Sequence, residues 1–320
     1  MMETISIDLT TIRSVIERVD MLGIMSEAFV AHSEGRSVIP PVGELMVDGP
    51  PSGEVHIKYG YIRGGRHYVV KIASGFPGNQ RIGIPSGSGL MLLFDVRTGM
   101  LSAILQDEGH LTDVRTAAAG ALVSKVMSTA PVETVGIVGT GVQARLQARF
   151  LVRHVGCRNV LLWGRDEDHA RDAVDDISSS GVETSRATSV DEIVDSCRLI
   201  ITCTSSTSPL IRSGALRPGT HVTAIGSDTP EKQEIESSIL GSADVVAVDC
   251  IEQSMLRGEV SQAIRAGVLS RGRVVEIGSI LNGSAPGRVG DDQITIADLT
   301  GVAVQDLLIA EAVSDLCADG

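Results

Sequence analysis

Aromatic residues are scarce in this chain of 320 amino acids. They make up 2% of it, and Trp163 is the single tryptophan. A stacking platform for nucleic-acid bases or sugar rings therefore has little to be built from. Positive charge is also in the minority, with 27 lysines and arginines against 40 acidic residues and a formal net charge of -13. Because neutralising phosphates requires a basic surface, this balance argues against a general nucleic-acid-binding protein.

Paired cysteines and long apolar runs are missing too. The five cysteines are scattered without metal-ligand spacing, so we expect reduced thiols and no metal site. No apolar run reaches the length of a membrane span, and Met1–Arg36 lacks the basic start, apolar core and cleavage site of a signal peptide. We therefore expect a cytoplasmic protein with no membrane partner. A hydrophobic content of 43% and 35 glycines instead fit an α/β protein with room for two domains.

The most informative stretch of the chain is a strand, a glycine turn and a helix. The apolar segment Thr134–Val138 runs into Gly139-Thr-Gly-Val-Gln-Ala144, after which Arg145–Val155 carries apolar residues at helical spacing. In this fingerprint Gly139 permits the tight turn, Gly141 lets the backbone approach a pyrophosphate, and Ala144 lets the helix pack on the strand. The helix N-terminus offers N–H groups to the phosphates. An ordinary strand-to-helix turn is the alternative, but more strand-helix units follow, which favours dinucleotide binding.

Those later units predict the fold class. Strands alternate with helices through the second half of the chain, which is typical of a Rossmann-type doubly wound parallel sheet in an α/β protein. In chain order the expected elements are the strand Val160–Trp163, the helix Asp166–Ser178, the strand Val182–Ala187, the helix Val190–Asp195, and the strands Leu199–Cys203, Thr220–Ile225, Val245–Val248 and Ile294–Leu299.

The first third of the chain has a different pattern. Helical spacing over Ser6–Ala31 predicts one or two amphipathic helices. Short β-prone segments separated by turn residues predict an antiparallel meander of Glu54–Tyr61, His67–Ala73, Leu90–Asp95 and Leu101–Leu105. Helices are expected at Asp113–Met127 and Val302–Leu316. We expect the last helix to return to the first domain, so that residues 1–118 and 303–320 form a discontinuous α+β domain and residues 119–302 form the dinucleotide-binding domain.

The end of the second parallel strand bears on cofactor choice. An acidic residue there would bind the ribose 2′-hydroxyl of NAD, whereas an arginine pairs with the 2′-phosphate of NADP. The chain has Gly164-Arg165 at this point and no strand-terminal acid. Since a guanidinium matches phosphate geometry, Arg165 favours NADP(H). An exposed arginine that pairs with Asp166 or stacks on adenine is the alternative, and NAD(H) is compatible with both interpretations.

Two cations are expected in apolar surroundings. By strand alternation Lys71 shares a face with Val69 and Ala73, and Arg115 lies in the first turn of an alanine-rich helix. Buried cations must be paired, so these two either meet carboxylates of the protein or are kept for the carboxylate of a substrate. With two of them expected in the walls of one cleft, we favour substrate binding.

A single carboxylate is a candidate for proton transfer. Asp228 follows the strand Thr220–Ile225 at its carboxyl end, where ligands sit in open α/β sheets. It could act as a general acid or base. The alternative is that it caps a helix beginning after Pro230.

These segments together resemble the ornithine cyclodeaminase/mu-crystallin family over essentially the whole chain. The matching motifs are Lys71-Ile-Ala-Ser-Gly-Phe-Pro-Gly-Asn79, Leu90-Met-Leu-Leu-Phe-Asp95, Leu111-Thr-Asp-Val-Arg115, Gly139-Thr-Gly-Val-Gln-Ala144, and Gly226-Ser-Asp228 with Lys232-Gln-Glu234. The resemblance implies a homodimer whose first domain, completed by the C-terminal helix, is a substrate-binding and dimerisation domain. It also implies hydride transfer between a nicotinamide and an amino-acid α-carbon, because members include alanine dehydrogenases, imino-acid reductases and cyclodeaminases that recycle bound NAD.

The resemblance assigns roles to individual residues. Lys71 and Arg115 look like the family's ligands of the substrate carboxylate, with Lys71 and Asp228 as catalytic residues. The residues implied to bind the cofactor are Thr112, Gly139, Thr140, Gly141, Val142, Gln143, Ala144, Gly164, Arg165, Thr202, Thr204, Ser205, Gly226, Ser227 and Asp228.

The chain departs from the family pattern in two places. Many relatives carry an arginine shortly after the position of Pro41 that helps to hold the substrate carboxylate, whereas this chain has Val42-Gly-Glu44. Lys58 could supply the missing positive charge, although an exposed strand lysine is the alternative. Cyclodeaminases of ornithine and lysine also tend to have Gly-Gly-Asp-Cys-Pro-Gly-Lys-Thr-Glu, where this chain reads Gly226-Ser-Asp-Thr-Pro-Glu-Lys-Gln-Glu234.

With Arg165, these departures favour an NAD(P)H-dependent imino-acid (ketimine) reductase or amino-acid dehydrogenase acting on a small carboxylate such as Δ1-pyrroline-2-carboxylate. An ornithine or related diamino-acid cyclodeaminase is the first alternative. A non-catalytic protein that holds a small ligand with the help of NADP is the second.

Overall fold

The computed structural model describes residues 4–49 and 51–318, and it separates the chain into two compact units. The first unit comprises the described residues up to Arg115 together with those from Val302 onward, and the second spans Thr116–Gly301. The boundaries expected from the sequence lie at 118/119 and 302/303. Within the described residues, no helix combines the length and the apolar composition that a membrane crossing requires.

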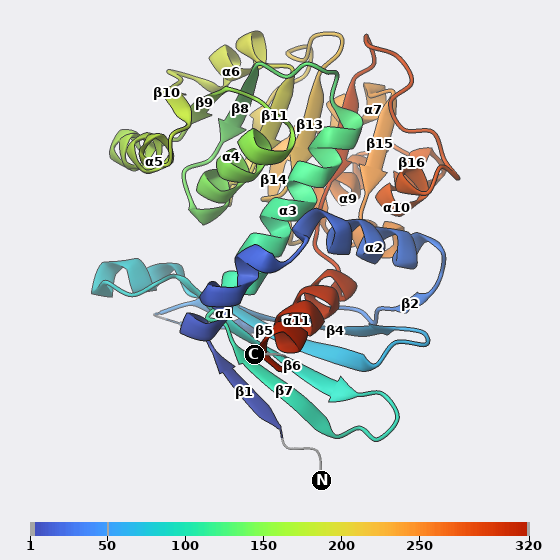
Figure 1. Cartoon of the computed structure of the whole chain (residues 1–320). Coiled ribbons are helices and arrows are strands. Elements are labelled where there is room, and N and C mark those ends of the chain that lie inside the picture. The colour runs from blue at the N-terminus through green and yellow to red at the C-terminus, as the bar shows by residue number, and fades with distance from the viewer. Residues whose placement is uncertain (1–3, 50, 319–320) are drawn as a thin grey trace. The chain divides into compact units, whose positions relative to one another are not determined.

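The first unit is built on a mainly antiparallel sheet (Figure 1). From one edge to the other its strands are β1 (Ile5–Asp8), β7 (Leu101–Gln106), β6 (Gly87–Asp95), β5 (His67–Gly75), β4 (Gly53–Ile62) and β2 (Ser37–Val38), while β3 (Gly43–Val47) pairs with β4. The β1–β7 pair is parallel, and the other pairs are antiparallel. The expected meander is therefore confirmed.

Helices cover one face of this sheet. They are α1 (Leu9–Val15), η1 (Ile16–Arg18), α2 (Met21–Ser33), α11 (Ala303–Ala318) and, of α3 (His110–Met127), the first turns. A short helix, η2 (Pro77–Ile82), connects β5 to β6. Helix α11 lies across β4, β5 and β6, as Figure 1 shows, and it also packs against α2. Lys71 and Val69 on β5 are both buried, which matches the face expected from strand alternation.

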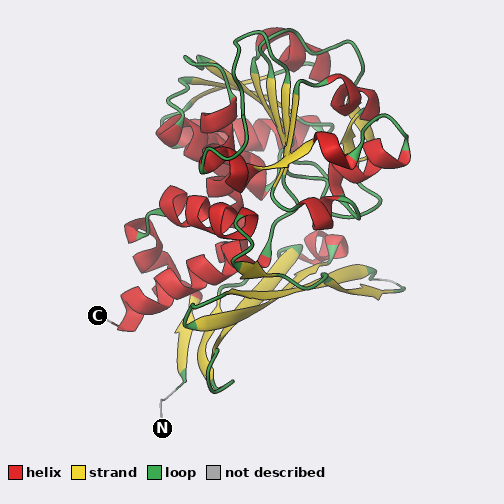
Figure 2. Ribbon diagram, turned by 90° about the vertical axis from the view of Figure 1, so that its right-hand side faces the viewer, coloured by secondary structure: helices red, strands yellow, loops and turns green. Residues whose placement is uncertain are grey.

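The second unit contains a wholly parallel sheet. Its strand order is β10 (Glu183–Arg186), β9 (Asn159–Trp163), β8 (Thr134–Val138), β11 (Leu199–Thr202), β13 (His221–Ala224), β17 (Thr295–Asp298), β15 (Val245–Val248) and β16 (Val274–Glu276). Figure 2 shows helices on both sides of these strands. Strand β8 has its successors β9 and β10 on one side and β11 and β13 on the other, so the sheet has a topological switch point between β8 and β11.

The remaining elements of the second unit surround this sheet. The helices are α4 (Val142–His154), α5 (Glu167–Ser179), α6 (Val190–Ser196), α7 (Ser237–Ser242), α8 (Ile251–Ser254), α9 (Gly258–Arg265), η3 (Arg271–Arg273) and α10 (Ile277–Leu281), and β12 (Thr207–Ile211) pairs with β14 (Gln233–Ile235). A core of buried aliphatic side chains fills the space between strands and helices. The expected doubly wound α/β fold with a second α+β domain is thus confirmed.

The helical interpretation of the N-terminus is wrong over its first residues. Ile5–Asp8 pairs with β7 in parallel register instead of joining the helix. The helix begins only at Leu9 because the carboxylate of Asp8 accepts a hydrogen bond from the backbone N–H of Thr11 at 2.8 Å and so caps the first turn.

Candidate active site

The glycine turn after β8 has the backbone geometry that a dinucleotide requires. Gly139 has a φ of +139°, and a Cβ there would lie 2.8 Å from Cys203 Sγ. Gly141 is the N-cap residue of α4, and a Cβ on it would meet no described atom within 4 Å. Gly141 thus leaves open space at the N-terminus of α4, and its cap has no side-chain hydrogen bond, which suits a pyrophosphate. Ala144 is fully buried where α4 packs on the sheet.

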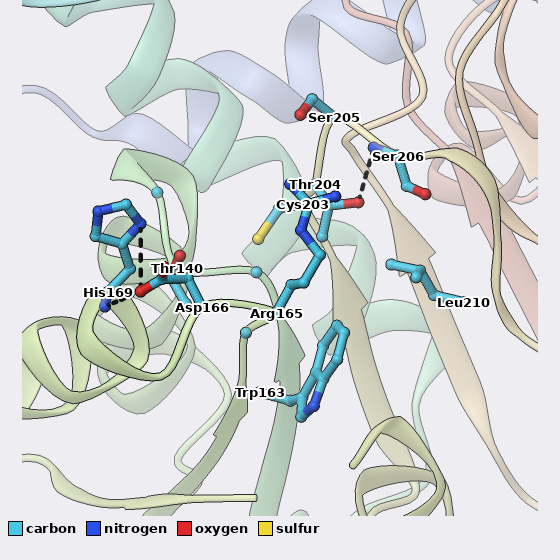
Figure 3. A pocket seen from close by; sticks show the side chains of 13 residues that line it. Thr140, Trp163, Arg165, Asp166, His169, Cys203, Thr204, Ser205, Ser206 and Leu210 are labelled. Carbon is cyan, nitrogen blue, oxygen red and sulfur yellow. Dashed lines mark hydrogen bonds and ion pairs between the residues drawn. The ribbon is translucent and has the colours of Figure 1, made fainter. Parts of the chain in front are cut away.

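A pocket of about 400 Å³ opens at the carboxyl ends of β8, β9 and β11, beside the switch point (Figure 3). Seven residues expected to bind the cofactor line it: Gly139, Thr140, Gly141, Gly164, Arg165, Thr204 and Ser205. Six lining residues were not expected: Trp163, Asp166, His169, Cys203, Ser206 and Leu210. Trp163 ends β9 and Cys203 directly follows β11, so the strand ends were a signal that could have identified these two.

Arg165 extends into this pocket from the end of β9, as Figure 3 shows. The neighbouring acid, Asp166, caps a helix: it is the N-cap residue of α5 and accepts a hydrogen bond from the backbone N–H of His169 at 2.9 Å. That hydrogen bond lowers the pKa of Asp166 below its ordinary value. The position of a ribose-binding acid therefore carries a cation and a capping carboxylate.

The loop after β13 carries Asp228. Its carboxylate forms an ion pair with Lys232 at 2.7 Å, and the two side chains are 40% and 20% exposed. In the same loop the Ser227 hydroxyl donates to the Lys232 carbonyl at 2.7 Å. Asp228 is therefore held within a closed loop at the carboxyl edge of the sheet, and it caps none of the described helices.

The remaining residues expected to bind the cofactor lie outside the pocket lining. Val142 and Gln143 are in the first turn of α4, and Thr112 is on the part of α3 that belongs to the first unit. Thr202 ends β11, and Gly226 lies two residues beyond the end of β13.

A second group of residues, in the first unit, gathers buried charge. Lys58, Lys71 and Arg115 are 7%, 3% and 4% exposed, and Lys58 on β4 lies directly opposite Lys71 on β5. Asp306 on α11, which is fully buried, forms ion pairs with Lys71 and Arg115. We call Lys58, Lys71, Arg115 and Asp306 the cationic cluster.

The contacts of this cluster are centred on Asp306. Its Oδ2 lies 3.0 Å from Lys71 Nζ, and its Oδ1 accepts from Arg115 Nε at 2.9 Å. Arg115 Nη1 also donates to Gln305 Oε1 at 3.3 Å, whereas its Nη2 donates to none of the described residues. Lys71 and Arg115 thus meet a carboxylate of the protein, which is the first of the two interpretations of these buried cations.

Burial and charge shift the pKa values of this cluster in opposite directions. Burial lowers the pKa of Lys71, with Asp306 opposing the shift and Arg115 adding to it. Burial alone would raise the pKa of Asp306, but Arg115, Lys71 and Lys58 outweigh it and hold that pKa below the ordinary value. Asp306 is therefore charged at neutral pH, and Lys71 is closer to releasing its proton than an exposed lysine.

The second unit has a contrasting group of buried acids. Glu234, Glu259 and Asp298 are each at most 1% exposed, and we call them the acidic cluster. Burial raises the pKa of Glu234 to about 7 and that of Asp298 to about 8, and it raises the pKa of Glu259 as well, with the Asp298 charge adding to the effect. Backbone N–H groups meet these carboxyls, including that of Val260, which donates to Asp298 at 2.9 Å.

Comparison with known proteins places the chain in a family. The model of the Ornithine cyclodeaminase/mu-crystallin family matches residues 3–320. An uncharacterized cyclodeaminase of Sinorhizobium fredii is 39% identical over 298 residues, covering 91% of this chain and 88% of that protein. An alanine dehydrogenase of Archaeoglobus fulgidus is 31% identical over 313 residues, with 98% and 94% covered. A Δ1-pyrroline-2-carboxylate reductase of Bacillus cereus is 32% identical over 247 residues, with 76% and 75% covered.

Solved structures of similar enzymes match the fold of this chain over nearly its whole length. An archaeal alanine dehydrogenase dimer with bound NAD matches with a TM-score of 0.88 at 28% identity, covering 99% of this chain and 97% of that one. The iminosuccinate reductase of Paracoccus denitrificans in complex with NAD+ matches with a TM-score of 0.87 at 27% identity, with the same 99% and 97% covered. On the family match and the full-length relatives, this chain belongs to the ornithine cyclodeaminase/mu-crystallin family.

Proposed function

We propose that this protein is an NAD(P)H-dependent imino-acid reductase, or amino-acid dehydrogenase in the reverse direction. It would transfer a hydride between nicotinamide and the α-carbon of a small substrate such as Δ1-pyrroline-2-carboxylate. The observation that carries the proposal is the cationic cluster, in which three cations are buried and Asp306 pairs with Lys71 and Arg115, on a chain whose other unit has a dinucleotide fold. Relatives named for alanine dehydrogenase and for imino-acid reductase activities support this class of reaction.

The substrate carboxylate is proposed to bind the cationic cluster. Arg115 directs only Nε and Nη1 to described partners, so Nη2 is available to a ligand. Lys71 and Lys58 add positive charge at low exposure, where an ion pair with a ligand is screened least. In this proposal the first unit is the substrate-binding and dimerisation domain of a homodimer; the archaeal alanine dehydrogenase relative is itself described as a dimer.

Proton delivery is proposed to involve Asp228 and Lys71. Reduction of a C=N bond adds a hydride to carbon and a proton to nitrogen, so an acid must stand near the imine nitrogen. Asp228 is held at the carboxyl edge of the parallel sheet by an ion pair with Lys232, and we propose that its carboxylate takes a proton from solvent and passes it to the imine nitrogen. Lys71, with its lowered pKa, would orient the carboxylate and serve as a second proton-transferring group.

The residues of the second unit fit a nicotinamide dinucleotide, because Gly139 and Gly141 leave room for a pyrophosphate at the start of α4. When bound, that cofactor supplies the hydride. We propose that Thr112, Thr140, Val142, Gln143, Thr204, Ser205 and Ser227 contact it. Arg165 supports a preference for NADP(H), although the related structures contain NAD.

A cyclodeaminase is the second candidate, favoured by the relative with 39% identity that carries this name. Such an enzyme would oxidise ornithine or a similar diamino acid and return the same hydride after cyclisation. It would release ammonia without net formation of NADH, which separates it from the reductase.

The test is a matched pair of assays on the purified protein. Oxidation of NADPH and NADH would be followed with Δ1-pyrroline-2-carboxylate, Δ1-piperideine-2-carboxylate, and pyruvate or oxaloacetate plus ammonia. L-Ornithine with NAD would be tested for ammonia release in parallel. Oxidation with any imino acid supports the reductase and identifies its substrate class. Ammonia release from ornithine without imine reduction would overturn it in favour of the cyclodeaminase.

A further inference from the structure

The carboxylate of Glu234 accepts hydrogen bonds from two separate backbone segments, and none of the roles proposed above explains them. It lies at the centre of β14 and is fully buried. Its Oε1 accepts from the backbone N–H and the hydroxyl of Thr204 at 2.6 and 2.7 Å. Its Oε2 accepts from the Thr202 hydroxyl at 2.8 Å and from the backbone N–H of Gly226 at 2.9 Å. One carboxylate therefore receives four hydrogen bonds.

The four donors belong to two different loops of the cofactor-binding unit. Thr202 and Thr204 lead from β11 into the segment that lines the pocket, whereas Gly226 begins the loop that carries Asp228. The two backbones approach so closely that a Cβ at Gly226 would overlap the Thr204 backbone. Glu234 thus binds the pocket wall and the base of the Asp228 loop at the same time.

The C-terminal end of the Asp228 loop also lies next to Glu234. Ser227 donates to the Lys232 carbonyl, and Lys232 forms the ion pair with Asp228. Lys232 precedes Glu234 by two residues, so the loop both starts and ends at this carboxylate. Behind it, Glu259 accepts from the backbone N–H groups of Glu234 and Ile235 at 2.6 and 3.2 Å, which fixes β14 in turn.

The four donors around Glu234 are satisfied only if both of its side-chain oxygens accept hydrogen bonds. Two of the four donors are backbone N–H groups, which cannot reverse their polarity. A glutamine would keep one acceptor oxygen but turn an NH2 group toward a donor, leaving a buried donor unpaired. The site therefore requires a carboxylate and not merely a side chain of this size.

We propose that Glu234 is a positioning residue, which holds the cofactor pocket wall formed by residues 203–206 and the Asp228 loop in the single arrangement that hydride and proton transfer need. The inference rests on the proposed function. Glu234 acts through Thr204, Gly226 and Asp228, and it touches neither substrate nor cofactor. Substrate affinity, which the cationic cluster supplies, does not depend on it.

The experiment compares Glu234→Gln with Glu236→Gln. Glu236 lies two residues further on, and its carboxylate accepts from the Ser213 N–H and the Ser238 hydroxyl, away from both loops. Amide hydrogen exchange of the protein without cofactor, NADPH binding by nicotinamide fluorescence, and steady-state kinetics with the imino acid would be measured on both variants and the wild type.

Glu234→Gln should exchange the Thr204 or the Gly226 amide at least about tenfold faster, because the glutamine NH2 group cannot accept from the N–H group that it faces. NADPH affinity should fall about tenfold and kcat about tenfold or more, while KM for the imino acid stays within about twofold. Glu236→Gln should match the wild type in all of these measurements. Thr202→Val is the milder second variant, since among the described residues the Thr202 hydroxyl bonds only to Glu234, and it should change the same quantities about threefold.

Each result of this experiment supports or contradicts the positioning role. If wild-type protein is active but Glu234→Gln behaves like Glu236→Gln, the positioning role is wrong. A loss of thermal stability with unchanged exchange, NADPH affinity and kcat per folded molecule would likewise show a merely structural carboxylate. Should Glu234→Gln fail to fold, wild-type values for Thr202→Val would overturn the inference. Wild-type protein that neither binds NADPH or NADH nor oxidises them would instead overturn the proposed function.

Discussion

The two units bury charge in opposite ways. In the second unit, the acidic cluster consists of carboxyls that backbone N–H groups meet, and burial raises their pKa values. In the first unit, the cationic cluster contains three buried cations, and two of them, Lys71 and Arg115, pair with the carboxylate of Asp306. An acid can relieve burial by keeping its proton, but an arginine cannot become neutral. We therefore propose the buried cations of the first unit as the binding site of an anion, whereas Glu234 in the second unit holds two loops together.

The largest expected effect comes from removing a cation of the cationic cluster. Lys71→Met should lower kcat/KM for the imino acid by about a thousandfold, because a buried charge contact to the substrate carboxylate is worth several kcal/mol. Steady-state kinetics measures this. Lys125→Met, which alters an exposed lysine on α3, is the control and should keep wild-type kinetics. A loss below about threefold for Lys71→Met would contradict the carboxylate site.

Removing the carboxylate of the same cluster should act on stability. Asp306→Asn leaves Lys71 and Arg115 buried without their shared partner and should lower the free energy of unfolding by about 3 kcal/mol. Chemical denaturation measures it. The matched control on the same helix is Asp315→Asn, whose ion pair with Arg66 is more than half exposed on both sides and should be worth at most about 1 kcal/mol. Equal losses in the two variants would show that burial does not set the strength of these pairs.

The acidic cluster can be tested through pH. Because the pKa of Asp298 is about 8 in the fold, the folded chain keeps a proton that the unfolded chain has already lost at neutral pH. Its contribution therefore lowers stability as pH rises from the ordinary carboxyl pKa to about 8, by up to about 1.4 kcal/mol per unit. Asp298→Asn should flatten the decline of unfolding free energy between pH 6 and 8. Asp315→Asn should retain the wild-type slope, and an unchanged slope in Asp298→Asn would refute the raised pKa in the acidic cluster.

An exposed cation should matter least. Arg165 lies at the pocket and is exposed, so its pairing with a 2′-phosphate is partly screened. Arg165→Ser should reduce the ratio of kcat/KM for NADPH over NADH by about tenfold. Arg171→Ser, on the exposed face of α5, provides the comparison and should leave the ratio unchanged. If Arg165→Ser also leaves it unchanged, the preference for NADP(H) has another source.

Local signals in the sequence predicted much of this architecture. The glycine turn at Gly139 follows from residue types within one short segment, and alternation along β5 placed Lys71 on a buried face. The four-residue strand Ile5–Asp8 was missed because its pairing with β7 depends on residues nearly one hundred positions away.

The partners of the charged residues were harder to predict for the same reason. Asp306 is 191 positions from Arg115, and nothing local in the C-terminal helix distinguishes it from the other acids there. Glu234 belongs to a motif of the family resemblance, but its four donors depend on how β11, β13 and β14 come together in three dimensions. Spacing along a chain indicates which charges are buried, whereas the fold determines which charges meet.

Isotope transfer tests the proposed hydride transfer most directly. NADPH and NADH carrying deuterium on either face of C4 would be incubated with Δ1-pyrroline-2-carboxylate, and the product examined by mass spectrometry and NMR. We predict proline with deuterium at the α-carbon from one of the two faces, and a loss of this transfer in Lys71→Met. Proline without deuterium would contradict the reductase, as would the absence of any reduced amino-acid product from this or another imino acid of the panel while ornithine yields ammonia.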